Sequence, residues 1–130
     1  MTYLLDVNSL LALAHAAHVH HERMEAWVRS LPRSDRLATC AITELGFVRI
    51  APQARLSPDV AAARALLAAL RENRRRRFVR LADDLGADSL PSWVRTPGQT
   101  TDGHLVALAA ARSTRLATLD EAVPDAVHIP

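Results

Sequence analysis

Four acidic side chains stand where short apolar runs end or where helices are expected to begin. They are Asp6, Glu44, Asp102 and Asp120. Carboxylates that a fold brings together repel one another, and a bound divalent cation relieves that repulsion. Mg²⁺ is coordinated by carboxylate oxygens and water, and paired ions can stabilise both oxygens of a phosphodiester displacement. The pattern therefore predicts a magnesium site built from these four acids.

Each acid, taken alone, has a purely structural explanation. Glu44 and Asp102 suit the positive ends of their helices, whereas Asp6 and Asp120 suit turns. Four acids at matching points of successive elements nevertheless favour one shared site. Asn8 lies two residues beyond Asp6 and can reach the same edge, where it would steady Asp6 or a bound water. Thr101 offers a hydroxyl beside Asp102, and a helix cap is an equally good role for it.

Apolar runs and turn signals predict an alternation of strands and helices. We expect strands at residues 3–5, 37–40, 78–81 and 116–119, with a short fifth strand at 127–129. We expect helices at 10–14 after an N-cap at Ser9, at 20–30, at 43–50, from an N-cap at Ser57 to about residue 73, and from a cap at Thr100 or Thr101 to residue 112. Residues 83–98 should form a loop with a short helical piece at 90–94.

This alternation predicts an α/β fold, because successive parallel strands need right-handed helical crossovers. The expected architecture is a three-layer α/β/α sandwich around a central, mostly parallel sheet of four to five strands. Residues 1–130 should form a single domain. Ligands of such open sheets gather at the carboxyl ends of the strands, where Asp6 and Asp120 stand.

Composition limits the remaining possibilities. The chain has one cysteine, Cys40, so it holds no internal disulfide. Its 16 basic residues are all arginine, which excludes any mechanism that needs a lysine ammonium group. No apolar stretch approaches the roughly 20 residues that span a bilayer, and no signal peptide is evident. We therefore expect a cytoplasmic protein without a membrane partner.

The motifs around the four acids resemble a known family. They are Leu4-Leu5-Asp6-Val7-Asn8 followed by Leu10-Leu11-Ala12-Leu13, His18-x-x-His21 ahead of Trp27, Thr43-Glu44-Leu45-Gly46-Phe47-Val48-Arg49, Thr101-Asp102-Gly103-His104-Leu105, and Leu116-Ala117-Thr118-Leu119-Asp120. Their order and spread over nearly the whole chain are similar to a PIN domain, specifically the VapC toxin of bacterial type II toxin–antitoxin pairs.

This resemblance implies a PIN-like fold and a magnesium-dependent endoribonuclease in which Mn²⁺ can replace Mg²⁺. It implies hydrolysis of RNA by metal-activated water, a VapB-like antitoxin partner and a toxin homodimer. The acidic quartet of the family carries over to Asp6, Glu44, Asp102 and Asp120, with Asp6 and Asp102 the firmest metal contacts. Glu121 departs from the aromatic or basic residue that is often found after the last acid, and this leaves the role of Asp120 open.

Other residues suggest RNA contacts or structural roles. The run Arg74, Arg75, Arg76 and Arg77 can attract phosphates or form a solvated helix end, and Arg49 is a further phosphate-contact candidate. Trp93, in the expected loop, is the better of the two tryptophans for stacking on a base or a partner. His15, His18, His20 and His21 are expected at a helix–helix junction, and His104 is expected to be structural.

Two other function classes remain as alternatives. A phosphoacceptor receiver domain has similar length and clustered aspartates, but it uses a lysine that this chain lacks. A non-catalytic PIN-fold module that binds antitoxin or RNA keeps the fold without the chemistry. The sequence does not specify which RNA is cleaved, how many ions bind or which antitoxin pairs with the chain.

Overall fold

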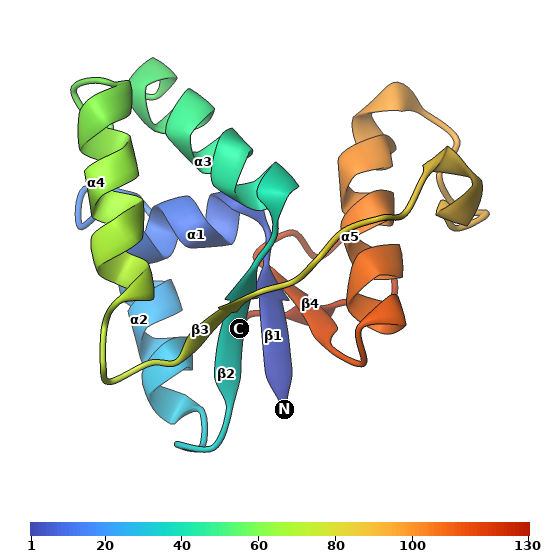
Figure 1. Cartoon of the computed structure of the whole chain (residues 1–130), viewed down its shortest axis with the longest axis horizontal. Helices are drawn as coiled ribbons and strands as arrows, with labels where there is room; N and C mark the ends of the chain where they lie inside the picture. The colour runs from blue at the N-terminus through green and yellow to red at the C-terminus, as the bar shows by residue number, and fades with distance from the viewer.

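Five parallel strands form the sheet at the centre of the molecule (Figure 1). The computed structural model describes residues 1–130. The strands are β1 (Thr2–Leu5), β2 (Arg36–Thr39), β3 (Phe78–Arg80), β4 (Arg115–Thr118) and β5 (Val127–His128), in the order β3-β2-β1-β4-β5. Leu4 of β1 pairs with Ala38 of β2 on one side and with Leu116 of β4 on the other. The expected parallel sheet is confirmed, with all five strands present.

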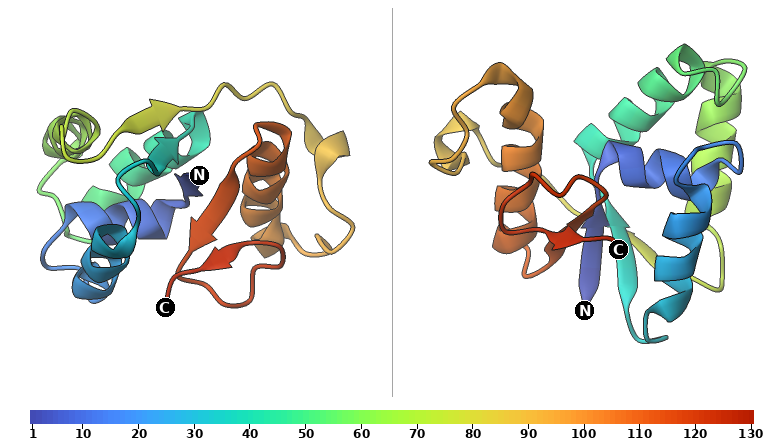
Figure 2. Two further views of the ribbon diagram at one scale, coloured as in Figure 1. Left: turned by 90° about the horizontal axis from the view of Figure 1, so that it is seen from below. Right: turned by 180° about the vertical axis from the view of Figure 1, so that it is seen from behind.

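Helices cover both faces of this sheet (Figures 1 and 2). They are α1 (Val7–Ala14), α2 (His21–Ser30), α3 (Ala41–Gln53), α4 (Val60–Arg71) and α5 (Thr100–Ala111), with 3-10 turns η1 (Ala87–Ser89) and η2 (Pro97–Gln99) before α5. Leu5 packs with α1 to α4, whereas its neighbour Leu4 packs with α5. Because successive strand side chains point to opposite faces, this split produces the predicted three layers.

Two helices begin at aspartates rather than at the serines that we expected. Asp6 caps α1 by accepting the backbone N–H of Ser9 at 2.8 Å, so Ser9 lies inside the helix. Asp59 caps α4 in the same way, with its carboxylate 2.8 Å from the N–H of Ala62. A carboxylate at the N-cap is also attracted to the positive end of the helix dipole. A neutral hydroxyl is attracted less strongly.

Three further boundaries differ from the sequence prediction. The helix expected at residues 43–50 runs on through Pro52 to Gln53. Gln99 precedes α5, so the two threonines lie within its first turn rather than at its cap. The helical piece expected at 90–94 is replaced by η1 and η2 on either side of it. Proline is tolerated near the end of α3 because only one hydrogen bond of the last turns is lost. No helix of the structure is both long and apolar enough to cross a membrane.

Candidate functional site

Three of the four predicted acids line one pocket at the carboxyl edge of the sheet. The pocket has a volume of about 220 Å³ and is lined by Asp6, Val7, Asn8, Thr101, Asp102, Leu105 and Asp120. Asp6 follows β1, Asp120 follows the neighbouring β4, and the first turn of α5 carries Asp102. Adjacent parallel strands end at the same edge, so side chains more than 90 residues apart meet there.

Asp6 is held rigidly by hydrogen bonds to both of its oxygens. Its side chain is buried, and one oxygen accepts the N–H of Ser9 that caps α1. The other oxygen accepts the hydroxyl of Thr118 at 2.5 Å, and the same hydroxyl oxygen accepts the backbone N–H of Asp120 at 3.0 Å. Thr118 thus links Asp6 with Asp120 across the β1–β4 pair.

Thr118 supports the candidate site through these hydrogen bonds, and the sequence prediction did not include it. A signal for it is present in the chain, because Arg-Leu-Ala-Thr occurs twice, at residues 36–39 and 115–118. Both copies form strands whose last residue is a fully buried threonine. Each of these threonines donates to one acid of the predicted quartet: Thr118 to Asp6 and Thr39 to Glu44.

The pocket carries negative charge that no cationic side chain neutralises. Asp6, Asp102 and Asp120 form no ion pair. The acids that do form ion pairs in the structure are Glu25, Asp35, Glu44, Asp83 and Asp84. Burial, together with repulsion from Asp6 and Asp120, raises the pKa of Asp102 above its ordinary value. A group that is harder to ionise beside like charges is in a position where a cation would bind favourably.

The donor set of the pocket fits a hard, largely hydrated cation. Carboxylates with a neighbouring hydroxyl and amide are the oxygen-rich ligands that Mg²⁺ accepts, and Mg²⁺ usually takes only one or two protein carboxylates and keeps several waters. No group of three or more acidic, histidine or cysteine side chains is packed tightly enough to enclose an ion by itself. The residues present therefore fit an ion held by one or two acids and several waters, rather than a closed protein cage.

The structure does not bring Glu44 into this pocket, although we expected all four acids to converge. Its carboxylate forms two hydrogen bonds with Arg80, at 2.9 and 3.1 Å, accepts the Thr39 hydroxyl at 2.7 Å and lies 3.8 Å from Arg71. Glu44, Arg71 and Arg80 line a separate pocket together with other residues of α3 and α4. Burial raises the pKa of Glu44, but the hydrogen bonds from Arg80 and Thr39 and the charge of Arg71 outweigh it, so the pKa lies below its usual value.

Sheet order explains why Glu44 has cationic partners. Arg80 ends β3, which pairs with β2 so that Arg80 lies opposite Thr39. Glu44, in the first turn of the helix that follows β2, therefore faces β3 rather than β1 and β4. The sequence gives no indication that Arg80 is the partner of Glu44, because strand order cannot be read from the chain.

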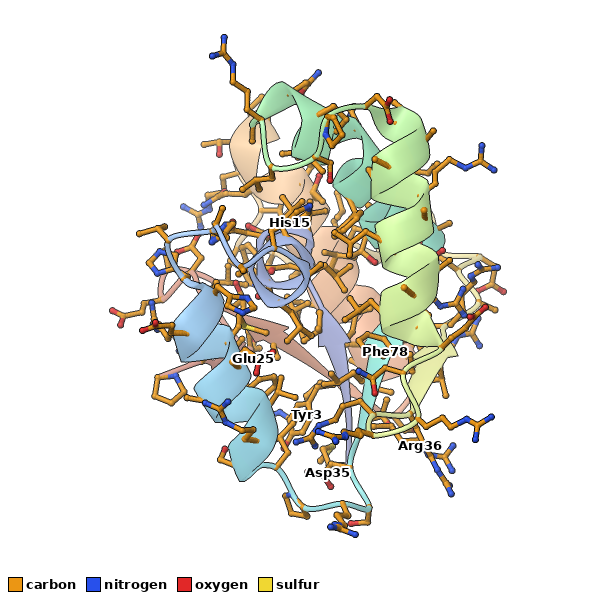
Figure 3. The ribbon with its side chains drawn as sticks, turned by 90° about the vertical axis from the view of Figure 1, so that its left-hand side faces the viewer. Tyr3, His15, Glu25, Asp35, Arg36 and Phe78 are labelled. Carbon is orange, nitrogen blue, oxygen red and sulfur yellow. The ribbon has the colours of Figure 1, made fainter.

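The other candidate residues for RNA contact lie in three places. Arg49 is exposed on α3 and lines an apolar groove that shares Val7 and Thr101 with the acidic pocket. Trp93 is half-buried against the α5 core, and its indole nitrogen is buried without a hydrogen-bond partner. Arg74 to Arg77 line a pocket of about 920 Å³ between α2 and α4, with Glu25 and Phe78 on either side of it (Figure 3).

This arginine run lies at the opposite edge of the sheet from the acids. Arg77 directly precedes β3, and its carbonyl accepts the backbone N–H of Leu37 near the start of β2. The run is therefore at the amino ends of the strands, whereas Asp6 and Asp120 follow carboxyl ends. The two sites share no lining residue.

The histidines form contacts at the junction of α1 and α2. His15 is buried, stacks on Phe47 and hydrogen-bonds Ser57 at 2.8 Å, and it lies beside α1 in Figure 3. His21 contacts the carbonyl oxygen of Ala12 at 2.7 Å. His18 contacts Asn8 of the acidic pocket, which the sequence did not suggest.

His104 stands apart from this junction, on α5. Its Nε2 lies 2.6 Å from the carboxylate of Asp83, in the segment that follows β3. This contact attaches the segment to α5 and gives His104 the structural role that we expected for it.

Comparison with known proteins gives consistent similarities. Residues 3–128 match the model of the PIN domain. The chain is 42% identical over 125 residues to ribonuclease VapC38 of Mycobacterium tuberculosis, covering 92% of this chain and 86% of that protein. It is 40% identical over 129 residues to ribonuclease VapC44 of the same species, covering 95% and 89%.

A solved structure is similar along its whole length. The crystal structure of M. tuberculosis VapC20, described as a sarcin-ricin loop cleaving toxin, superposes with a TM-score of 0.69. The two chains are covered completely and are 15% identical. At that identity the similarity supports the fold alone.

Proposed function

The chain belongs to the PIN-domain family, among its VapC ribonucleases, and from that membership we propose that it is a magnesium-dependent endoribonuclease toxin. Its substrate is RNA, and its reaction is hydrolysis of a phosphodiester bond without a covalent intermediate. The observation that carries the proposal is the pocket of Asp6, Asp102 and Asp120, three carboxylates with no cationic side chain among them.

Mg²⁺ or Mn²⁺ would be held among Asp6, Asp102 and Asp120, by one or two of these acids directly and otherwise through water, and when bound it would supply Lewis acidity and neutralise charge on the phosphodiester. The protein's contribution is to fix the oxygens in advance. Asp6 cannot rotate freely, because Ser9 and Thr118 hold its two oxygens. Asn8 and Thr101 add neutral polar groups to the same pocket. Such preorganisation lowers the cost of arranging charge during reaction.

Glu44 takes a different role in this proposal from the one that the quartet implied. In the present geometry it neutralises Arg80 and Arg71 and does not contact the acidic pocket. We assign it to holding β3 and α4 together beside the site. A move of Glu44 toward the pocket would require the loss of two charge-assisted hydrogen bonds and is not needed for metal binding by the other three acids.

The proposal includes two protein partners, a VapB-like antitoxin and a second copy of the chain. The exposed apolar side chains Ile42, Leu45 and Val60, around a groove of about 750 Å³, support coverage of part of this surface by protein. Light scattering on the purified chain measures the expected homodimer directly. Co-expression with the product of the adjacent reading frame tests the antitoxin.

A binding module without catalysis is the second candidate function. Two observations favour it. The acidic, histidine and cysteine side chains do not form a closed metal site, and Glu44 forms ion pairs with arginines. Such a module would bind RNA or antitoxin equally well with or without divalent metal. Cleavage assays separate the two functions.

The central test is Asp6→Asn, assayed on RNA with the purified chain freed of any partner. Asparagine caps a helix as well as aspartate does, so α1 should be preserved while one pocket charge is lost. We expect wild-type protein to cleave RNA with Mg²⁺, and both EDTA and Asp6→Asn to abolish cleavage. Asp59→Asn is the matched control, because it makes the same change at the cap of α4, outside the pocket.

Two results would contradict the proposal. RNA that is bound but never cut at any concentration of Mg²⁺ or Mn²⁺ would favour the binding module. Asp6→Asn that cleaves as fast as Asp59→Asn would exclude the acidic pocket as the site. Isothermal titration with Mn²⁺, on wild type and Asp6→Asn, measures metal uptake independently of cleavage.

A further inference from the structure

His18 connects the histidine-rich junction to the acidic pocket. It lies in the segment between α1 and α2, and its ring nitrogen Nε2 is 3.0 Å from Oδ1 of Asn8, a residue that lines the pocket. Its other ring nitrogen, Nδ1, accepts the backbone N–H of His20 at 3.0 Å. Both nitrogens of this ring are therefore engaged, one by the backbone and one by Asn8.

These two contacts determine where the proton of the ring lies. A backbone N–H can only donate, so Nδ1 of His18 must present a lone pair. A neutral imidazole then carries its proton on Nε2, and Nε2–H donates to Asn8. Burial, followed by the neighbouring His20, His15 and His21, lowers the pKa of His18, which favours the neutral ring that this geometry requires.

The same argument fixes the orientation of the Asn8 amide. Because His18 Nε2–H is a donor, the Asn8 atom that meets it must be the carbonyl oxygen rather than the NH₂ group. The NH₂ group is thus the end of Asn8 left to donate to another partner. Nothing else in the structure hydrogen-bonds the Asn8 side chain.

An NH₂ donor has a specific use in this pocket. The three carboxylates can only accept hydrogen bonds when ionised, and they repel a phosphate group. The amide of Asn8 donates without carrying charge, so it can bind a phosphate oxygen and does not compete with a cation for the carboxylates. Thr101 is the other side chain of the pocket with a hydrogen-bond donor.

We propose that the Asn8 NH₂ group donates to a non-bridging phosphate oxygen of the RNA, and that His18 is the positioning residue that holds Asn8 in the required orientation. This inference rests on the proposed ribonuclease function. It adds Asn8 to the acidic site as a contact with the substrate. His18, which lies outside the acidic pocket, holds Asn8 in place.

Two substitutions at His18 separate positioning from local structure. In His18→Gln, the amide nitrogen of glutamine lies as far along the side chain as Nε2 and can still donate to Asn8, but the acceptor for the His20 N–H is lost. In His18→Asn, the side-chain oxygen replaces Nδ1 and can accept the His20 N–H, but the side chain is too short to reach Asn8. A positioning role and a purely structural role therefore predict opposite outcomes.

The measurements are kcat and KM for a fluorogenic RNA at saturating Mg²⁺, with thermal unfolding of each variant. Loss of a supporting hydrogen bond of this kind typically costs about 10- to 100-fold in activity, and we expect His18→Asn to show this loss in kcat/KM. His18→Gln should retain most of the wild-type value. In an Asn8→Ala background, adding His18→Asn should cause no further loss, because the two residues act as one unit.

Three outcomes would overturn the inference. One is His18→Asn with wild-type kinetics, and another is His18→Gln impaired while His18→Asn is active. The third is a nitrogen-15 NMR spectrum in which the proton of His18 resides on Nδ1. Failure of the ribonuclease proposal would look different, because wild-type protein would then cleave no RNA with any divalent metal, while the NMR spectrum would still report the His18 proton.

Discussion

The carboxylates of the acidic pocket differ mainly in their hydrogen-bond partners. Asp6 is fixed by a helix cap and by Thr118, whereas Asp102 has no hydrogen-bond partner of its own. Asp102 is also the acid whose pKa is raised, by burial and by repulsion from Asp6 and Asp120. Repulsion among carboxylates that have no cationic partner is expected to weaken the fold of the metal-free protein.

Asp102→Asn should therefore stabilise the metal-free protein at neutral pH. An acid whose pKa is higher in the folded state makes the folded state less favourable once it ionises, and asparagine removes that effect. The gain should be below about 1 kcal/mol, because Asp102 is only partly buried. It should vanish below about pH 4, where the carboxyl group is protonated in both states. Urea unfolding in EDTA at pH 7 and pH 3.5 measures it.

The same variant should lose RNA cleavage, so stability and activity would change in opposite directions. Asp88→Asn, on an exposed turn without an ion pair, is a suitable control for the removal of one negative charge. A destabilised Asp102→Asn at neutral pH in EDTA would show that the pocket charges do not repel as inferred.

At the scale of elements, α1 and α3 cross at a glycine. A Cβ atom on Gly46 would lie 2.5 Å from Cγ2 of Val7, closer than real Cβ contacts allow. Val7 is the first residue of α1 and Gly46 lies in the second turn of α3, and both helices start at the carboxyl edge of the sheet. The close approach of these helices therefore sets the position of the groove beside the acidic pocket.

Gly46→Ala should destabilise the protein by about 1–3 kcal/mol, because an added methyl group forces the two helices apart. This outcome is opposite to the gain of about 1 kcal/mol that alanine gives at an uncrowded helical position. Urea unfolding provides the measurement. The double variant Gly46→Ala/Val7→Ala should recover most of the loss, and Gly98→Ala, with open space around it, should be neutral. A stabilised Gly46→Ala would show that no such contact limits the crossing.

The segment between β3 and α5 is attached by three polar contacts to His104 of α5 and to Arg112 at its C-cap. Asp83 accepts from His104 at 2.6 Å, and Arg112 reaches the Ala82 carbonyl oxygen at 2.9 Å and Asp84 at 3.0 Å. Burial raises the pKa of Asp83, but the hydrogen bonds from His104 and Leu85 and the charges of His104 and Arg112 outweigh it and lower the pKa. Ionised Asp83 therefore stabilises the attachment.

Asp83→Asn should lower stability at pH 7 by about 1 kcal/mol, since the Asp83–His104 contact is only partly buried and asparagine can still accept a hydrogen bond. A lowered folded-state pKa gives stability that is present above the unfolded value of about 3.9 and is lost as pH falls through the folded value. The difference from wild type should thus shrink as the pH falls below about 3.9 and disappear once the pH is below the lowered folded-state pKa of Asp83. Thermal unfolding across this pH range, with Asp88→Asn for comparison, measures it. A difference that persists at low pH would indicate a role other than charge.

At the scale of the whole molecule, the arginine run at residues 74–77 and the acidic pocket occupy opposite edges of the sheet. Arg74 to Arg77 lie at the amino ends of the strands and the acids lie at the carboxyl ends. A strand of four residues spans about 13 Å, which indicates the scale of the separation along the strands. An RNA that contacts both sites must extend across this distance.

Replacing all four arginines at 74–77 with glutamine should weaken binding of long RNA more than that of short RNA. The salt dependence of affinity should fall, with the slope of log K against log salt reduced by up to about 3 if all four contact phosphates. Cleavage of a tetranucleotide should be unchanged. Fluorescence anisotropy with RNAs of 4 and 20 nucleotides at several salt concentrations tests this. Equal affinity of variant and wild type for the long RNA would show that the arginines at 74–77 do not contact RNA.

The sequence alone was sufficient to predict the layers of the fold and three acids of the candidate site. Apolar runs of strand length alternating with amphipathic segments dictate a parallel sheet with helices on both faces, and strand ends then collect Asp6 and Asp120. Helix N-caps were less predictable, because serine and aspartate compete for positions a few residues apart, as at Asp6 and Ser9.

Only the tertiary structure decided which neighbours each acid meets. Strand order β3-β2-β1-β4 places Arg80 beside Glu44 and Thr118 beside Asp6, and local pattern carries no information on order. The contact of His18 with Asn8 likewise depends on how the chain turns between α1 and α2. Periodicity reports which face of an element is buried, whereas long-range pairing depends on how all the elements pack together.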